Sequence, residues 1–305
     1  MQDSGRIALV GTGLLGGSIG LALRAQGYQG VRVGIGRRQE TVDQARELGC
    51  IDEGHTSLQD GLAGCDLIIL ATPIRTILEQ LSEVSRHARP DAVVTDVGST
   101  KAAIVEAVQR DLAHPQRFVG SHPMAGAERT GPQAARADLF RNKPCIITPA
   151  PGAAPGSGPG AGPGNGTDAA AVARVRKLWT DLGMKVQTMT PAAHDLAVAR
   201  ISHLPHALAA LLVQLAARRG EIEMASTGFR DATRVASSDA ELWADIFLTN
   251  QAAVAQALKD LCAQAEGFQE ILRSGERAKL VTFLAASRSQ RDNWIMGKTW
   301  AQEEG

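Results

Sequence analysis

The sequence predicts an α/β domain built on a parallel sheet, followed by a domain made only of helices. Three observations lead to this prediction. The first half alternates short apolar, β-branched runs with helical patterns, which is typical of β-α-β units around a parallel sheet. A glycine-rich turn directly follows the first run. From residue 191 to residue 300 the chain is rich in Ala and Leu at helical spacing and shows no strand pattern.

Seven apolar runs in the first half have the composition of buried parallel strands. They cover residues 7–10, 31–35, 66–71, 92–96, 117–120, 145–148 and 185–189. With 305 residues, the chain is long enough for two domains. We therefore expect a first domain over residues 1–190 and a helical domain over residues 191–300.

Two parts of the chain refine this division. Residues 149–167 are almost purely Pro, Gly and Ala, so they cannot bury enough apolar surface to offset the entropy of ordering them. We expect a flexible surface insertion there, and place the domain boundary at Pro191 because a helix and a strand pattern follow the insertion. Residues 204–217 and 252–272 are expected to form long helices of the second domain.

Composition narrows the class of partner. Lys plus Arg and Asp plus Glu number 32 each, so the chain has no net positive field for a nucleic acid or an anionic membrane, and a small molecule is the expected partner. The four cysteines contain no Cys-x-x-Cys pair, which favours reduced thiols and excludes finger-type zinc sites. No basic-then-apolar leader and no apolar run near 18 residues is evident. We therefore expect a cytoplasmic protein that does not span a membrane.

A glycine motif gives the first indication of a ligand. It consists of Gly11, Thr12, Gly13, Leu14, Leu15 and Gly16, and it lies between the first strand and a helix. In a Rossmann-like domain the first glycine permits the tight turn, the second lets the backbone approach a pyrophosphate, and the third lets the helix pack on the strand. The free N–H groups of the helix N-terminus then bind the phosphates. This strand–turn–helix context predicts a dinucleotide site, against the alternative of a glycine-rich turn without a ligand.

The residues at the end of the second strand indicate which dinucleotide binds. NAD-binding domains usually carry Asp or Glu there to accept a hydrogen bond from the ribose 2′-hydroxyl, but this chain has Arg37 and Arg38. Two guanidinium groups can pair with a 2′-phosphate, so the sequence favours NADP, with NAD possible. The alternative is that one or both arginines lie in solvent.

Further residues at strand ends are expected to line the same cleft. Thr72 and Pro73 follow the third strand, and Ser99 follows the fourth. Ligands of open α/β sheets bind at the carboxyl ends of the strands. Ordinary loop chemistry would also explain these residues.

Histidines indicate the chemistry. His122 is expected just past a strand end, beside the nicotinamide position, where a neutral imidazole can accept a proton as hydride leaves the same substrate. His194, His203 and His206 form a second group, for which a metal site is one interpretation. Helix capping or burial with hydrogen bonds is the other, because Pro205 suggests a helix just beginning and no His-Glu-x-x-His pattern is present.

Six blocks together make a more specific signature. They read GTGLLGGSIG from residue 11, ATP at 71–73, DVGSTK at 96–101, GSHPMAGAE at 120–128, HDLAVARISHLPH at 194–206 and GFRDATR at 228–234. In this order and spacing they resemble the prephenate and arogenate dehydrogenase family of tyrosine biosynthesis, over almost the whole chain. The resemblance implies oxidative decarboxylation of prephenate or arogenate with reduction of NAD(P)+, and a helical domain that forms a homodimer.

The resemblance also implies residue roles. His122 would accept the proton of the substrate's ring hydroxyl, and Ser99 would orient it. His206 and Arg234 would bind the substrate, with the Arg234 guanidinium pairing with a carboxylate. Arg230 would be a second cation, or would pair with Asp231. Glu128 would lie near the substrate's side chain.

Two other classes of protein share parts of this pattern. A β-hydroxyacid dehydrogenase also joins a dinucleotide domain to a helical one, but it needs a catalytic lysine in the helical domain. Lys259 is the candidate for this lysine, but the residues around it form no recognisable motif. A dinucleotide sensor would bind NADP without turnover, and would need neither the HPMAG histidine nor the arginine block.

Overall fold

The computed structural model describes residues 5–126, 129–150 and 166–303. Most of the Gly/Pro-rich segment expected to be an insertion, residues 151–165, lies outside this range. The chain packs into two compact units, Met1–Gln251 and Ala252–Gly305.

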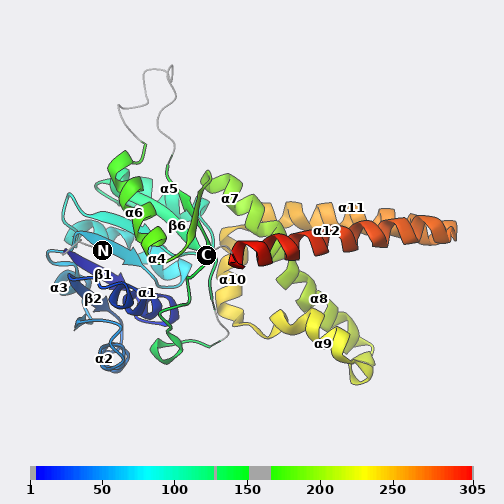
Figure 1. Ribbon diagram of the computed structural model, residues 1–305, viewed down its shortest axis with the longest axis horizontal. Helices are drawn as coiled ribbons and strands as arrows, with labels where there is room; N and C mark the ends of the chain where they lie inside the picture. Colours follow the sequence, from blue (N-terminus) through cyan, green and yellow to red (C-terminus); the bar gives the residue numbers. More distant parts are fainter. Residues whose placement is uncertain (1–4, 127–128, 151–165, 304–305) are drawn as a thin grey trace, which may run out of the picture. The chain divides into compact units, whose positions relative to one another are not determined.

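An eight-stranded sheet organises the first unit (Figure 1). Its order is β3-β2-β1-β4-β5-β6-β7-β8, and all neighbours are parallel except the antiparallel pair β6 and β7. The strands are β1 (Arg6–Val10), β2 (Val31–Ile35), β3 (Glu53–His55), β4 (Leu67–Leu70), β5 (Val93–Asp96), β6 (Phe118–Pro123), β7 (Pro144–Thr148) and β8 (Lys185–Thr188). The parallel sheet predicted from the sequence is confirmed.

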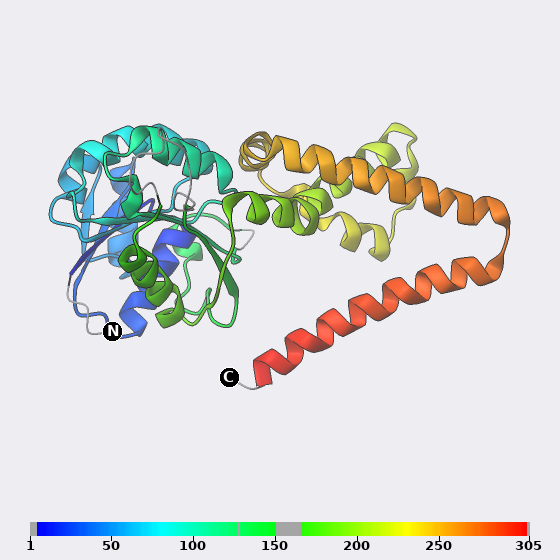
Figure 2. The same cartoon turned by 90° about the horizontal axis from the view of Figure 1, so that it is seen from above.

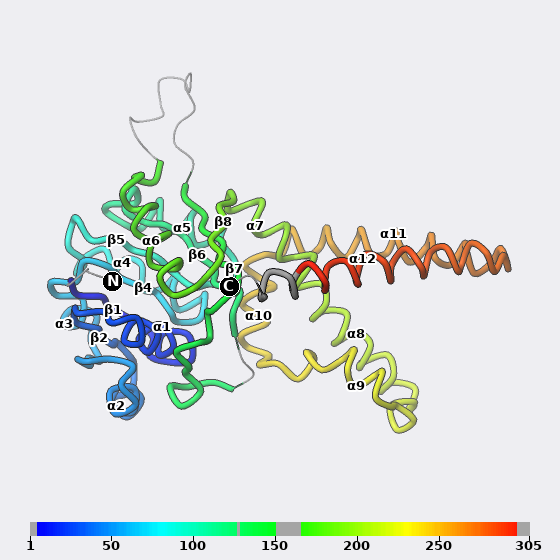
Figure 3. Tube along the Cα trace, viewed as in Figure 1, coloured from blue at the N-terminus to red at the C-terminus, as the bar shows by residue number. Residues whose placement is uncertain are grey.

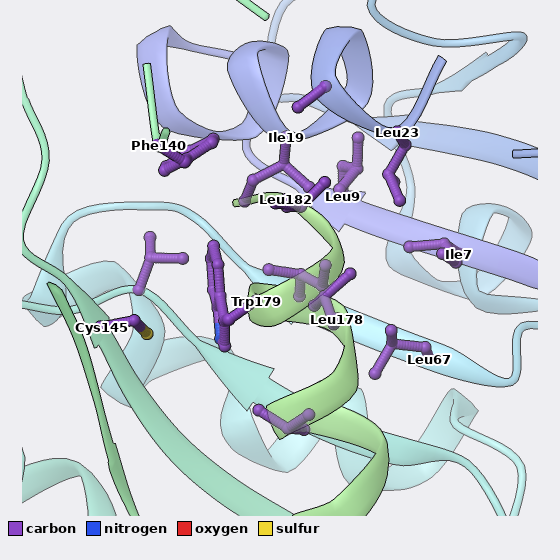
Figure 4. Packing of buried hydrophobic residues seen from close by; sticks show 14 of the residues in the cluster. Ile7, Leu9, Ile19, Leu23, Leu67, Phe140, Cys145, Leu178, Trp179 and Leu182 are labelled. Atoms are coloured by element: carbon purple, nitrogen blue, oxygen red, sulfur yellow. The ribbon is translucent and has the colours of Figure 1, made fainter. Parts of the chain in front are cut away.

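Helices cover both faces of this sheet because successive strand residues point to opposite faces. Ile7 and Leu9 belong to one buried core, whereas Ala8 and Val10 belong to another. The first core also contains Trp179 and is shown in Figure 4. The helices of this region are α1 (Leu14–Ala25), α2 (Gln39–Glu47), α3 (Leu58–Leu62), α4 (Ile74–His87), α5 (Ala102–Asp111) and α6 (Ala169–Asp181).

The helical region begins at Pro191, as predicted, and continues the first unit (Figure 3). Its helices up to residue 251 are α7 (Pro191–Val198), α8 (Leu204–Arg218), α9 (Thr227–Thr233) and α10 (Ala240–Thr249). Helix α7 contacts α5 and β7, and α10 contacts α4. Because of these contacts the division between the compact units falls at Gln251 and not at Pro191.

A continuous helical segment, Pro191–Arg218, joins α7 to α8 through a π-helical turn at Ala199–His203. Pro205 therefore lies inside a helix and does not mark its beginning, contrary to the expectation. The wider turn before the proline fits the loss of one backbone hydrogen bond, which a proline imposes on a helix.

The segment Pro191–Arg218 is also long and apolar enough to cross a membrane by length and composition, although no apolar run of this kind was expected. Its His194 and Asp195 are buried and hydrogen-bonded within the first unit.

The second unit consists of most of α11 (Gln251–Ser274) and of α12 (Arg277–Glu303) (Figure 2). Gly275 joins the two helices with a positive φ of 65°. Phe268 and Phe283 pack across the pair, with 5.2 Å between their ring centroids.

Two strands differ from the prediction for identifiable reasons. β3 was not predicted, because three residues with half-buried side chains carry no readable alternation. β6 extends to Pro123, beyond the expected end at residue 120, because β7 pairs with its last four residues. His122 therefore lies within a strand, opposite Ile146, and not just past a strand end.

Candidate active site

A cleft of about 540 Å³ opens at the carboxyl ends of the first strands. Its wall contains the glycine turn after β1, the end of β2 and the loop after β4. Gly11 has a φ of +102°, and a Cβ there would lie 2.6 Å from the carbonyl oxygen of Ala71. A Cβ at Gly16 would lie 1.8 Å from the carbonyl oxygen of Gly11. Both positions therefore require glycine for the turn to approach β4 and for α1 to approach the turn.

The same turn has the form needed to hold a dinucleotide. A Cβ at Gly13 would meet no atom within 4 Å, so this part of the turn faces open space. No side chain of the described residues caps the N-terminus of α1, so its first N–H groups are available to an anion. The residues present therefore fit a pyrophosphate at this position. Leu14 and Leu15 begin α1 and pack against the core beneath it.

The structure places Arg37 and Arg38 on the wall of this cleft. Both side chains are exposed, and neither forms a hydrogen bond or ion pair with another described residue. Thr41 and Ser57 lie on the same wall and add hydroxyl groups. This part of the cleft can therefore receive an anionic group from the ligand.

Thr72 and Pro73 also lie on the wall, as expected from their position after β4. The Thr72 hydroxyl is 3.2 Å from Oε1 of Gln80, to which it donates a hydrogen bond. Ser99 does not line this cleft. It is half-buried after β5, and among the described residues it forms no hydrogen bond to His122.

A chain of three side chains ends at His122. Its Nδ1 lies 2.8 Å from Nε2 of His194, and Nδ1 of His194 lies 2.7 Å from Oδ1 of Asp195. A carboxylate can only accept, so Nδ1 of His194 carries the hydrogen, and its Nε2 accepts from Nδ1 of His122. A neutral His122 therefore presents the lone pair of Nε2. The network fixes the tautomer that a base requires.

Backbone N–H groups hold the carboxylate in this chain. Asp195 accepts hydrogen bonds of 2.8 Å from the backbone N–H groups of Lys101 and Ala102, at the N-terminus of α5. The partial positive charge of a helix N-terminus favours an anion there. Asp195 is 3% exposed, so these bonds compensate for the loss of water around its charge.

A buried ion pair supports the strand that carries His122. The Lys101 ammonium pairs with the Asp96 carboxylate, and both side chains are fully buried. Lys101 Nζ also donates to the Ser121 carbonyl oxygen at 2.8 Å, and Asp96 accepts from the Ser121 N–H at 3.1 Å. Burial lowers the pKa of Lys101, and the charge of Asp96 opposes this shift. These bonds tie β5 to β6 at the residue before His122.

Burial also lowers the pKa of His122 well below its usual value, and the nearby His194 and Lys101 lower it further. The imidazole is consequently neutral at neutral pH, in agreement with the tautomer that the hydrogen bonds assign. A neutral imidazole with a free Nε2 can accept a proton from a bound hydroxyl.

A second group of aromatic and polar side chains lies next to the hydrogen-bonded series Asp195–His194–His122. Nδ2 of Asn250 donates to the carbonyl oxygen of Asp195 at 2.9 Å and to Nδ1 of His203 at 3.2 Å. His206 stacks on Trp243 with 3.4 Å between ring centroids, and its Nδ1 donates to the Ser202 carbonyl oxygen at 3.1 Å. One alternative for these histidines was that they are buried and hydrogen-bonded. The structure shows this for His194 and His203.

The structure brings two of the predicted substrate-binding residues together. Helix α8, which carries His206, packs against the 3-10 turn Arg234–Ser237. Burial lowers the pKa of His206, and the positive charge of Arg234 lowers it further. Arg230 is exposed and lies 3.4 Å from Asp231, so the structure shows the pairing that was one alternative for it. Glu128 lies outside the described residues.

Several residues of this site were not identified from the sequence. Asp195, Lys101, Asp96 and Asn250 have no role in the sequence analysis, although Asp195 directly follows a histidine and Lys101 ends the DVGSTK block. The His-Asp pair was the available signal. It does not by itself indicate that His122, which is 72 residues away, is the third member.

Comparison with known proteins identifies similar chains. The sequence matches two family profiles, described as prephenate dehydrogenase, nucleotide-binding domain, over residues 19–155, and prephenate dehydrogenase, dimerization domain, over residues 190–286. It is 32% identical to a prephenate dehydrogenase of Bacillus subtilis, covering 96% of this chain and 76% of that protein. It is also 32% identical to a cyclohexadienyl dehydrogenase of Zymomonas mobilis, covering 93% and 94%.

Solved structures give the same result. The fold is similar to that of Aquifex aeolicus prephenate dehydrogenase in complex with hydroxyphenyl propionate and NAD+, with a TM-score of 0.82, 32% identity and coverage of 95% of this chain and 98% of that chain. A Synechocystis arogenate dehydrogenase gives a TM-score of 0.78, with 33% identity and coverage of 95% and 99%.

The buried His203 predicts how stability depends on pH. Burial lowers its pKa to about 4, against the attraction of Asp195, whereas a histidine in the unfolded chain titrates near about 6.5. Between these values the unfolded state binds the extra proton, so the free energy of unfolding should fall as the pH decreases from about 6.5 to about 4. Urea unfolding at a series of pH values measures this slope.

The His203→Gln variant should show a shallower slope over the same range. His55→Gln, a change on the edge strand β3, serves as the control and should keep the slope of the unmodified protein. An equal slope for the His203→Gln variant and the unmodified protein would contradict the assignment.

Proposed function

Because the chain belongs to the prephenate dehydrogenase family, we propose that it catalyses the NAD(P)-dependent oxidative decarboxylation of prephenate, of arogenate, or of both. The products are 4-hydroxyphenylpyruvate from prephenate and tyrosine from arogenate. The observation that carries this proposal is the chain from Asp195 through His194 to His122, which leaves a neutral imidazole with a free Nε2.

His122 has the role of general base in this proposal. The reaction oxidises the ring carbon that bears the 4-hydroxyl, releases the ring carboxylate as CO2 and forms an aromatic ring. When bound, the oxidised nicotinamide accepts the hydride. Nε2 of His122 accepts the hydroxyl proton, and the Asp195 carboxylate stabilises the resulting positive charge through His194. The proton returns from His122 to the ring oxygen when the aromatic ring forms, because both products keep the hydroxyl.

Arg234 and His206 bind the substrate in this proposal. Both substrates carry carboxylates, and a guanidinium offers two parallel N–H donors to one of them. Stacking on Trp243 holds the His206 ring in place, so its orientation is set before the substrate binds. Arg230, already beside Asp231, is the weaker candidate for a second cation. The roles of Ser99 and Glu128 rest on the family resemblance alone, because Ser99 forms no hydrogen bond to His122 among the described residues and Glu128 lies outside them.

NADP is the proposed preference among the two dinucleotides. Arg37 and Arg38 line the cleft at the end of β2, where the adenosine ribose binds in this class of sheet. Their positive charges favour the extra phosphate of NADP, and no acid is present there to accept a hydrogen bond from a 2′-hydroxyl.

A homodimer is the proposed assembly. Helix α8 exposes large apolar side chains, with Leu211 56%, Leu212 43% and Leu215 58% exposed. An exposed apolar face of this kind supports a protein interface. The segment also falls within the match to a dimerization domain.

A cytoplasmic location fits the three buried free thiols of Cys50, Cys65 and Cys145.

Two alternatives predict different measurements. A β-hydroxyacid dehydrogenase would use Lys259, but this lysine is exposed, whereas His122 belongs to a built hydrogen-bond chain. A dinucleotide sensor would bind NADP and reduce none. The absorbance at 340 nm, recorded with prephenate and arogenate each crossed with NAD+ and NADP+, separates these cases. Reduction in any of the four assays supports the proposed reaction, and binding of NADP+ with no reduction in all four supports the sensor.

The His122→Asn variant should lose most of its turnover. Removing a general base typically costs about 100- to 10 000-fold in rate, while cofactor binding should remain intact. Steady-state kcat and calorimetric binding of NADP+ measure the two effects. A near-normal kcat would exclude His122 as the base.

The Asp195→Asn variant tests the fixed tautomer. An Asn amide can donate to Nδ1 of His194, which would reverse both imidazoles and leave Nε2 of His122 protonated. We expect kcat to fall by roughly 10- to 1000-fold, with dinucleotide affinity retained. Asp91→Asn, at an exposed ion pair with Arg89, is the control and should keep its rate. An unchanged kcat in a folded Asp195→Asn protein would show that the carboxylate does not set the tautomer.

Replacing Arg37 and Arg38 with Gln together should weaken NADP+ binding by at least about tenfold, because charge-assisted hydrogen bonds to the 2′-phosphate are lost. NAD+ affinity should change by less than about threefold. Isothermal calorimetry measures both dissociation constants, and Arg46→Gln, an exposed arginine on α2, controls for overall charge. Equal weakening of both dinucleotides would contradict a 2′-phosphate contact.

A further inference from the structure

The Thr12 hydroxyl is an unexplained polar group in the dinucleotide cleft. Thr12 is the residue between the first two glycines of the turn, and it is 2% exposed. Its Oγ1 has no hydrogen-bond partner among the described residues. Thr12 nevertheless contributes to the cleft wall, so its buried hydroxyl lies close to the space that a ligand would occupy.

The neighbours of Thr12 show which part of the cleft it serves. A Cβ built on Gly36 would lie 3.3 Å from Oγ1 of Thr12, and one built on Gly34 would lie 2.8 Å from its Cγ2 methyl. The hydroxyl is therefore beside the end of β2, directly before Arg37, and the methyl is deeper under the strand. In dinucleotide-binding sheets this strand end contacts the adenosine ribose.

An unpartnered hydroxyl at this depth carries a cost. Buried polar groups are almost always hydrogen-bonded, and an unpaired one destabilises the folded chain. Valine has nearly the same shape and would avoid this cost. Packing alone therefore does not account for a hydroxyl at residue 12, whereas a ligand oxygen at the end of β2 does.

We propose that the Thr12 hydroxyl forms a hydrogen bond with a hydroxyl oxygen of the adenosine ribose when the dinucleotide binds. The inference rests on the proposed dinucleotide-dependent function, and it adds a contact that differs from those of Arg37 and Arg38. The arginines face the 2′-phosphate and distinguish NADP from NAD. The Thr12 hydroxyl contacts an oxygen that both cofactors carry, so it contributes to the affinity for both.

Thr148 provides a matched control. It is also fully buried, and its Oγ1 also lacks a partner among the described residues. It lies at the end of β7 opposite Gly120 and does not line the dinucleotide cleft. The two threonines therefore share the cost of an unpaired hydroxyl but differ in their access to the ligand.

The experiment compares the unmodified protein with its Thr12→Val, Thr12→Ser and Thr148→Val variants. Calorimetry measures the dissociation constants of NAD+ and NADP+, and thermal unfolding without cofactor measures stability. Thr12→Val should weaken both dinucleotides by roughly three- to tenfold, the range expected for one neutral hydrogen bond. Without cofactor, both valine variants should unfold at a midpoint equal to or a few degrees above that of the unmodified protein, because an unpaired hydroxyl is removed.

Thr12→Ser should keep the affinity within about twofold, because it keeps the hydroxyl. Thr148→Val should leave both dissociation constants unchanged. Unchanged affinity in the Thr12→Val variant would overturn the inference while leaving the proposed function intact. Weakening of NADP+ alone would overturn the ribose contact in favour of the 2′-phosphate. An unmodified protein that binds neither dinucleotide would overturn both the inference and the proposed function.

Discussion

The Asp195 carboxylate accepts three hydrogen bonds, and the rest of the site depends on them. Two come from the backbone at the N-terminus of α5, in the sheet region, and one comes from His194 on its own helix. The same group thus joins the helical region to the sheet and fixes the hydrogen positions of His194. Since His194 contacts His122, the tautomer of the proposed base is set by a packing contact between two regions of the chain.

A buried ion pair provides the second constraint. Removing a lysine and an aspartate from water is costly, and this cost is offset only where the charges are paired and further hydrogen-bonded. Lys101 and Asp96 meet both conditions through their contacts with each other and with the Ser121 backbone. Because Lys101 also donates its backbone N–H to Asp195, the pair holds β5, β6 and α7 in one arrangement. Burial keeps the His122 imidazole neutral, and the positive charge of Lys101 contributes to this.

The two ends of the site have different electrostatic character. Near His122, the buried charged groups Lys101, Asp96 and Asp195 are each held by hydrogen bonds. At the dinucleotide cleft, the helix N-terminus is uncapped, and Arg37 and Arg38 are unpaired among the described residues. The first arrangement suits a group that must hold one protonation state. The second suits an anionic ligand that completes the hydrogen bonds when it binds.

The sequence by itself determined the parallel sheet, the glycine turn and the helical region after Pro191, because each depends on residues close together in the chain. Alternating apolar residues specify strands, and the glycines specify a turn that larger residues cannot form. Only the tertiary structure decided that His194 and Asp195 complete the chain to His122, that Lys101 is buried against Asp96, and that β6 continues through His122. These features depend on contacts between segments far apart in the sequence, and neither periodicity nor local composition records which distant segments meet. The short strand β3 likewise depends on a contact with another segment. Its three residues form a strand because they pair with β2, and their own sequence does not indicate one.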